Sequence, residues 1–166
     1  LVGLVGDLSG CGNNTASVAS SVAEADSLPP ADKATVYFSK TIDAEHLIAL
    51  YKKINSEITG RVAIKLHTGE PNGPNILPRD MVKAFQAQIP NSVIVETNTL
   101  YGGARSTTER HRRTLKANDW TFCPVDILDE DGDVDFPVSR GFHLNEVAMG
   151  SHLTNYDSLI ALTHFK

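Results

Sequence analysis

Histidine and glutamate residues recur at the ends of apolar segments in this chain of 166 residues. The apolar run 62–66 is followed by His67 and Glu70, before a loop rich in Gly, Pro and Asn. Glu96 ends a second apolar stretch, and His164 lies near the end of the last one. Imidazole and carboxylate groups together suit zinc, iron or manganese. One interpretation is therefore a divalent-metal site formed by His67, Glu70, Glu96 and His164.

The same residue types fit a second chemistry, general acid–base catalysis. A histidine titrates close to neutral pH, and a neighbouring carboxylate can tune its pKa. His67 and His164 are the candidate acid–base residues, with Glu70 or Glu96 as the tuning group and Lys166 as a further catalytic candidate. No local metal motif such as HExxH is present, so both interpretations depend on how the fold brings these residues together.

Anion binding is a third interpretation. The loop Tyr101-Gly102-Gly103 precedes a predicted helix start, whose free N–H groups and dipole favour phosphate or carboxylate. The loop is neither GxGxxG nor a Walker sequence, so a simple turn into a capped helix remains an alternative. The candidate ligand-binding residues at this edge are Lys65, Asn98, Tyr101, Gly102, Gly103, Arg105, His111 and Asp126.

Alternating strands and helices must bring these residues together. Asp43 is a good N-cap, Pro78 suits the first turn of a helix, and Ser106 with Glu109 matches a capping box. Each of these signals begins an amphipathic helical stretch that follows a β-rich segment. The predicted strands are 34–38, 61–67, 92–96, 122–127 and 158–165, and an Asp-Gly turn in 129–133 predicts a hairpin whose returning strand is 134–138.

This order of elements predicts an α/β fold with three layers, a mainly parallel sheet with helices on both faces, and one β-hairpin. Ligands of such sheets bind beyond the carboxyl ends of the strands. Side chains two residues apart on a strand share a face, which pairs Lys65 with His67 and Glu96 with Asn98. The sequence therefore predicts a functional site at this edge, whereas His46 and His152 are expected to be surface or packing residues.

Composition excludes several classes of protein. The apolar fraction is 41% and the net charge is −5, so the chain carries no basic excess with which to neutralise nucleic-acid phosphates. No apolar run reaches the length of a membrane-spanning helix. The two cysteines, Cys11 and Cys123, form no CxxC motif and so no local zinc or iron–sulfur ligand set. Cys123 lies in an apolar strand and is expected to be a small core residue.

The N-terminal segment resembles an exported leader. Residues 8–11, LSGC, match a bacterial lipobox, in which Cys11 would receive lipid, and the following residues suit a flexible tether. The absence of a basic n-region and the presence of Asp7 count against this interpretation, and a disordered tail is the alternative. We expect a signal-peptide remnant and tether over 1–30, an α/β domain over 31–166, and an extracytoplasmic, membrane-anchored lipoprotein, with a cytoplasmic protein as the alternative.

Four longer stretches resemble the bacterial and archaeal domain-of-unknown-function 362 family. They are KLHTGEP, ETNTLYGGARSTTERH, PVDILDEDGD and NYDSLIALTHFK, which begin at Lys65, Glu96, Pro124 and Asn155. The resemblance implies an α/β protein longer than this chain, with a glycine-rich segment after the last motif. Because the last predicted strand has no helix after it and the chain begins within the leader-like segment, we expect the chain to be truncated at both ends. Some members carry cysteine clusters for 4Fe–4S centres, and this chain lacks such cysteines.

Three functions are consistent with the sequence. The first is a metal- or anion-dependent enzyme of unknown reaction, with a divalent metal as the candidate cofactor. The second is a non-catalytic lipoprotein that binds a small molecule or metal at the same edge. The third is an electron-transfer protein whose iron–sulfur cluster lies outside this chain. None of them involves nucleic acid.

Overall fold

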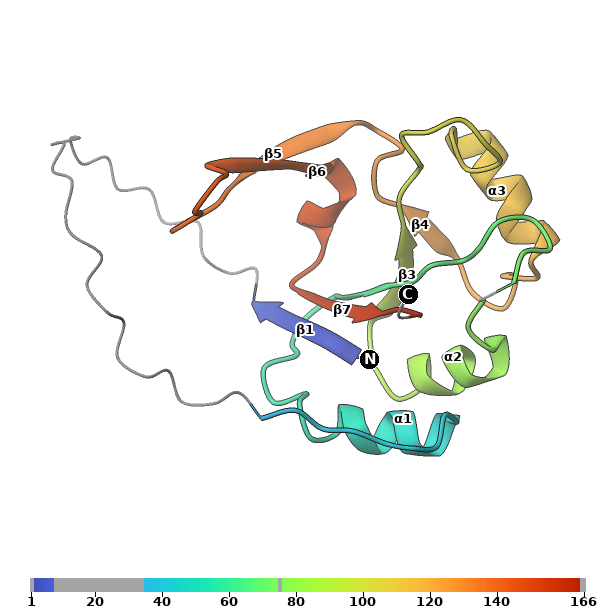
Figure 1. The fold of residues 1–166 in the computed structure, drawn as a ribbon, viewed down its shortest axis with the longest axis vertical. Helices are drawn as coiled ribbons and strands as arrows, with labels where there is room; N and C mark the ends of the chain where they lie inside the picture. The colour runs from blue at the N-terminus through green and yellow to red at the C-terminus, as the bar shows by residue number, and fades with distance from the viewer. Residues whose placement is uncertain (1, 8–34, 75, 165–166) are drawn as a thin grey trace, which may run out of the picture.

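The computed structural model describes residues 2–7, 35–74 and 76–164 and has an α/β fold (Figure 1). Four neighbouring strands of the main sheet run parallel, and β1 pairs antiparallel with β7 at one edge. This arrangement confirms the predicted fold class. Along the sheet the strands are β1 (Val2–Asp7), β7 (Ser158–Leu162), β2 (Val62–Lys65), β3 (Ser92–Glu96) and β4 (Val125–Ile127).

Within the described residues, three α-helices connect the strands, and a short 3-10 helix precedes β7. The Asp43 side chain accepts a hydrogen bond from the backbone N–H of His46 and so begins the first helix as predicted. At the third helix the cap is Thr107, one residue beyond the predicted Ser106, and it accepts from the backbone N–H of Arg110. The helices are α1 (Ala44–Tyr51), α2 (Arg79–Gln86), α3 (Thr108–Ala117) and η1 (Ser151–Asn155).

All three α-helices pack on one face of the sheet. The buried cluster on this face contains Val62 and Ile64 of β2, together with Phe85 of α2 and Leu115 of α3. Alternation along β2 places Ala63 in a separate buried cluster, as expected for a strand whose side chains point to opposite faces. Phe85 is fully buried and meets the ring of Tyr51 edge-on at 5.3 Å between centroids. This face supplies most of the core.

The second face is covered more thinly. Leu153 of η1 and Tyr156 pack there against Ala63 and Val95, and Phe136 joins them from the hairpin. Helical cover on this face is therefore the 3-10 helix η1 rather than an α-helix.

The single predicted hairpin is present, but its partner strand differs from the prediction. Strand β5 (Asp133–Pro137) pairs antiparallel with β6 (Glu146–Gly150) and not with β4. The residues after β4 form a turn, so β5 leaves the parallel sheet instead of folding back along it. Figure 1 shows this ribbon projecting beside the sheet.

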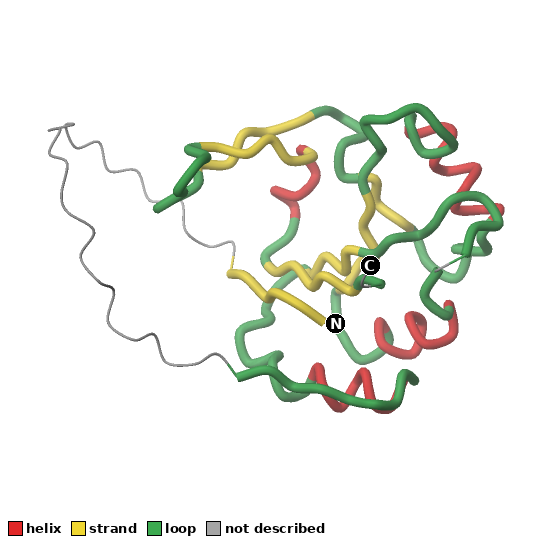
Figure 2. The backbone as a smooth tube through the Cα atoms, in the orientation of Figure 1, coloured by secondary structure: helices red, strands yellow, loops and turns green. Residues whose placement is uncertain are grey.

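Two predictions concern the N-terminal part of the chain: a strand at 34–38 and a signal-peptide remnant with a tether over 1–30. The predicted strand at 34–38 is absent over its described residues, 35–38, which form an exposed loop without a ladder partner (Figure 2). β-branched and aromatic residues favour a strand only where an edge is available to pair with. Residues 2–7, inside the predicted signal-peptide remnant, form β1; Cys11 and residues 8–34 lie outside the described residues.

Two further observations bear on the sequence analysis. Cys123 is a free thiol packed against the main core, and burial raises its pKa to about 11. It is therefore a protonated, partly buried thiol at the edge of the core, and it lies just before β4 rather than within a strand as predicted. Among the helices that the structure describes, none combines the length and apolar character that a membrane span requires.

Replacing Phe85 tests the assignment of the core. Phe85→Ala removes a fully buried ring, and we expect it to lower the free energy of unfolding by about 3–5 kcal/mol. Phe142→Ala is the matched control because that ring is 93% exposed, and its expected effect is within about 0.5 kcal/mol. Urea denaturation measures both values. Similar losses for the two variants would contradict the assigned core.

Candidate functional site

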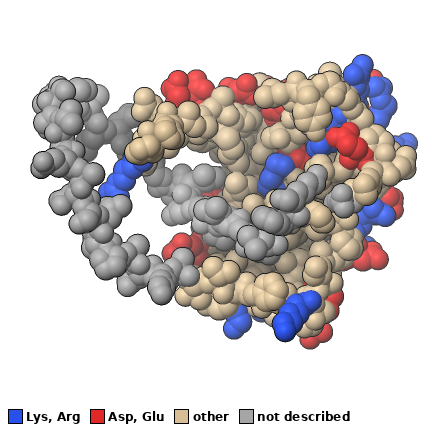
Figure 3. All heavy atoms as spheres, viewed as in Figure 1, with Lys and Arg blue, Asp and Glu red and all other residues tan. Residues whose placement is uncertain are grey.

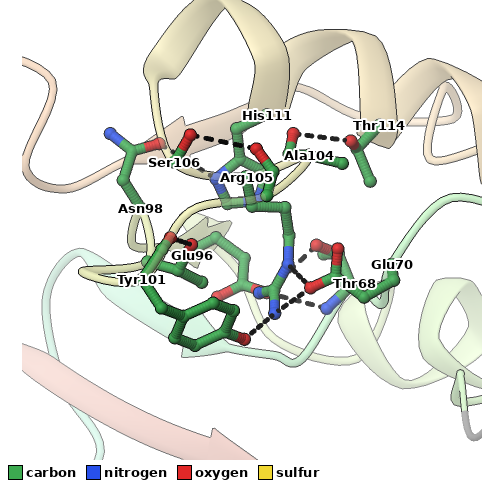
Figure 4. A network of polar contacts seen from close by, with 12 residues as sticks. Thr68, Glu70, Glu96, Asn98, Tyr101, Ala104, Arg105, Ser106, His111 and Thr114 are labelled. Carbon is green, nitrogen blue, oxygen red and sulfur yellow. Dashed lines mark hydrogen bonds and ion pairs between the residues drawn. The ribbon is translucent and has the colours of Figure 1, made fainter.

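The carboxylate of Glu96 is the centre of a polar network at the carboxyl ends of β2 and β3 (Figure 4). It is 1% exposed. Lys65 Nζ donates to Glu96 Oε2 at 2.5 Å, and the backbone N–H and hydroxyl of Thr68 donate to Oε1 at 2.7 and 3.0 Å. Nη1 of Arg105 lies 3.7 Å from the same Oε1. One buried acid thus joins two strand ends to the loop before α3.

Glu96 is ionised in this environment. Burial by itself raises the pKa of the Glu96 carboxyl. The charge and hydrogen bond of Lys65 and the two donors of Thr68 lower it by a larger amount, so the pKa is below its usual value. A buried carboxylate needs such partners, because an uncompensated charge would be costly to desolvate. The stabilisation from these contacts is present above the ordinary pKa and is lost as the pH falls through the lowered one.

Arg105 links this network to Glu70. Its Nε and Nη2 both lie 2.9 Å from Glu70 Oε1, and Nη2 also reaches the Tyr101 hydroxyl at 3.4 Å. The guanidinium is buried, whereas the Glu70 side chain is 45% exposed. Arg105 therefore has one buried carboxylate and one accessible carboxylate as partners.

The loop that carries Glu70 is held by the end of α3. Asn118 Nδ2 donates to the backbone oxygens of Thr68 and Glu70 at 3.0 and 2.9 Å, and Asn118 Oδ1 accepts from Asn72 N at 2.8 Å. The Trp120 indole N–H donates to Thr68 O at 3.0 Å. These contacts fix the backbone on both sides of Glu70 and do not involve its side chain, whose partner is Arg105.

His111 is a buried histidine with one unpartnered ring nitrogen. Asn98 uses its Nδ2 to donate to Thr108 Oγ1, which leaves Asn98 Oδ1 as the acceptor facing His111 Nδ1 at 3.3 Å. The proton is therefore assigned to Nδ1, and Nε2 is a buried acceptor without a partner among the described residues. Burial lowers the pKa of His111 and the nearby Arg105 adds to this, against an opposing contribution from Glu96, so the ring is neutral.

Asp126 belongs to a different network on the second face. Its carboxylate oxygens contact the Tyr156 hydroxyl and His152 Nδ1, each at 2.7 Å, and His152 Nε2 contacts Asp131 at 2.8 Å. These hydrogen bonds to Asp126 and Asp131 raise the pKa of His152. His152 is more than the surface or packing residue predicted, and no local motif indicates it, because its partners lie on a strand and a turn more than twenty residues away.

The structure brings together only part of the predicted metal set. Glu70 and Glu96 approach each other through Arg105, His67 is half-buried just after β2, and His164 is exposed. Across residues 2–7, 35–74 and 76–164, no group of three or more His, Cys, Asp or Glu is arranged to hold a metal ion. Lys166 lies outside the described residues.

A groove of about 420 Å³ lies beside α3 and the two loops of the network. Gly103 and Ala104 form one side, and a Cβ built on Gly103 would meet open space. Thr114 Oγ1 donates to Ala104 O at 2.9 Å and so fastens that loop to the helix. The lining residues are Pro71, Gly103, Ala104, Arg110, Arg113, Thr114 and Ala117.

Glu96→Gln tests the central role of the buried carboxylate. The variant leaves Lys65 and Arg105 with a neutral partner, so we expect the free energy of unfolding to fall by about 2–3 kcal/mol at neutral pH. Glu130→Gln breaks the exposed pair with Arg112 and is the control, with an expected loss below about 1 kcal/mol. Equal losses, measured by chemical denaturation, would contradict a central role for Glu96.

The His152 contacts predict a pH-dependent contribution to stability. Because the folded-state pKa is raised from 6.5, this contribution is complete below the ordinary value and is lost as the pH rises through the raised one. His152→Gln should therefore cost more stability in mildly acidic than in alkaline solution. Denaturation of both proteins across this range, with an NMR titration of the ring, measures the effect; a pH-independent difference would contradict it.

Comparison with known families supplies the last observation. Residues 62–166, which include both polar networks and the groove, match the family described as Domain of unknown function (DUF362). Neither the comparison with curated proteins nor the comparison with solved structures found a match. The match covers more than half of the chain and confirms the predicted resemblance. The chain therefore belongs to the DUF362 family.

Proposed function

We propose that this protein binds a small anionic ligand, a carboxylate or a phosphate, in the groove beside α3. The observation that carries the proposal is Arg110. Arg110 lines the groove, and its guanidinium donates a hydrogen bond to a neutral group, Ser106 Oγ, at 3.4 Å. Among the described residues Arg110 forms no ion pair, so its charge is available to an anion.

The wider surroundings support the same ligand class. Arg113 also lines the groove, and the described lining residues include no Asp or Glu. Arg113 pairs with Glu109 at 2.6 Å, but both side chains are exposed, and such pairs contribute little and exchange readily. Figure 3 shows Lys and Arg, with some Asp and Glu among them, on the side of the molecule where α3 lies, and Asp and Glu along much of the β5–β6 hairpin. An anion would therefore meet a locally positive face of an acidic protein.

The groove walls are suited to hold a ligand in one position. Pro71 directly follows Glu70, whose backbone oxygen Asn118 holds, and Ala104 directly precedes the buried Arg105. Thr114 fastens the Ala104 carbonyl to α3. A binding group on a fixed backbone loses less conformational entropy when a ligand arrives.

An acid–base enzyme is the second candidate function. The specific observation in its favour is the unpartnered Nε2 of His111, a neutral and buried proton acceptor next to Arg105. Perturbed ionisable groups of this kind gather at catalytic sites. A binding protein would leave its ligand chemically unchanged. If the protein is instead an acid–base enzyme, a His111→Gln variant should lose turnover and keep its affinity for the ligand.

Lipid attachment and metal binding are two further proposals for this protein. Export and lipid attachment at Cys11 are supported by the lipobox-like sequence LSGC, and incorporation of labelled fatty acid into the full protein, lost in Cys11→Ser, would test them. A divalent metal is supported only by the residue types of the predicted set. Elemental analysis of the purified protein would test it.

Arg110→Gln tests the proposed anion site. We expect it to weaken binding of inorganic phosphate and of acetate about fivefold, because one charge-assisted contact is lost. Arg112→Gln is the matched control: it is on the same helix but pairs with Glu130 and does not line the groove. Isothermal titration at low ionic strength measures both affinities. Equal effects of the two substitutions, or no binding to the unmodified protein, would contradict the proposal.

A further inference from the structure

We infer that the carboxylate of Glu70 occupies the position on Arg105 that a ligand carboxylate takes, so that the ligand binds by displacing Glu70. This inference rests on the proposed anion site, because the ligand would place a second anionic group in the groove beside Arg110. It names the ligand class as a small dianion with at least one carboxylate.

The geometry of the Arg105–Glu70 contact leaves room for a better partner. Nε of Arg105 donates to Glu70 Oε1 at 2.9 Å, and Nη2 forms an ion pair with the same oxygen at 2.9 Å (Figure 4). A carboxylate that approaches freely can instead give one oxygen to each N–H, and such bidentate pairs are the stronger arrangement. Glu70 is restricted by its own backbone, whose oxygen accepts from Asn118 Nδ2 and from Gly73 N, each at 2.9 Å.

Displacement would require little movement. The Glu70 side chain is 45% exposed, so its carboxylate can rotate into water while the backbone of the loop stays in place. An exposed carboxylate recovers its hydration when it leaves, which keeps the cost of exchange small. The buried position of Arg105 ensures that the vacated N–H groups stay aimed at the same point.

Arg105 keeps other partners when Glu70 departs. Nη1 lies 3.7 Å from Glu96 Oε1, and Nη2 lies 3.4 Å from the Tyr101 hydroxyl. Glu96 is shared with Lys65, so two cations would then face a single buried carboxylate. The resulting excess of one positive charge favours an incoming anion over an empty site.

The neighbouring groove sets the second requirement on the ligand. Two of its lining residues are the sequence neighbours of that pair: Pro71 follows Glu70 and Ala104 precedes Arg105, so the groove lies against the two loops that carry the Arg105–Glu70 contact. A ligand with one carboxylate on Arg105 can place its other anionic group toward Arg110. A short dicarboxylate or a phosphorylated carboxylic acid has this pattern of charges, whereas a monocarboxylate satisfies only one position.

The test compares a dicarboxylate probe, succinate, with acetate in the whole protein and in two variants. Glu70→Gln keeps a hydrogen-bond acceptor for Arg105 but removes the competing charge, and we expect it to tighten succinate binding about fivefold. Glu130→Gln is the matched control, because it also removes a carboxylate paired with an arginine but lies outside the groove. We expect it to leave the affinity unchanged.

An NMR measurement distinguishes the displacement of Glu70 from a change in ligand affinity alone. The Nε–H signal of Arg105, followed by NMR, should shift when succinate binds to the unmodified protein, because the partner of that N–H changes. Succinate binding with an unshifted Arg105 signal and no effect of Glu70→Gln would overturn the inference while leaving the anion site intact. Failure of both phosphate and succinate to bind would overturn the proposed function and the inference together.

Discussion

The buried carboxylate of Glu96 is the interaction on which the arrangement of this edge depends. It lies at the end of β3, and its partners come from the end of β2, from the loop after β2 and from the loop before α3. An ionised carboxylate in a core is stable only when donors and opposite charges surround it. The need to compensate the charge of Glu96 therefore fixes the positions of Lys65 and Arg105. Both lie at the carboxyl ends of the parallel strands, where α/β proteins commonly bind their ligands.

The two faces of the sheet carry chemically distinct networks. Glu96 lies on the helix-covered face, where Lys65 and Arg105 share it at the carboxyl end of the sheet, and Arg105 also meets a partly exposed carboxylate, Glu70. On the other face, Asp126 and His152 tie η1 to the end of β4 and to the turn that leads into the hairpin. The first network offers positive charge to a ligand, whereas the second joins the two ends of the β5–β6 ribbon. Sheet periodicity separates them, because Glu96 pairs in register with Ile127 and not with Asp126.

Local sequence patterns predicted the helices and the parallel strands well, because caps and apolar periodicity depend only on residues close together in the chain. The cap at Asp43 and the apolar runs of β2 and β3 are examples. Long-range pairing was not predictable in this way: β5 pairs with β6, and residues 35–38 find no partner strand at all. At the candidate site, the structure brings together Glu70, Glu96 and Arg105, which the sequence had proposed as metal-binding or ligand-binding residues, but only the fold shows that an arginine lies between the two acids. The contact of His152 with Asp126 gave no sequence signal, since it joins elements far apart in the chain.

A crystal structure of the protein with bound succinate would show whether the ligand displaces Glu70 from Arg105. The account predicts one carboxylate on Nε and Nη2 of Arg105, the Glu70 side chain rotated into solvent, and the second carboxylate in the groove beside Arg110. Glu96 should keep its contacts with Lys65 and Thr68. A structure in which succinate is bound elsewhere, or in which Glu70 still contacts Arg105 beside a bound ligand, would contradict the account.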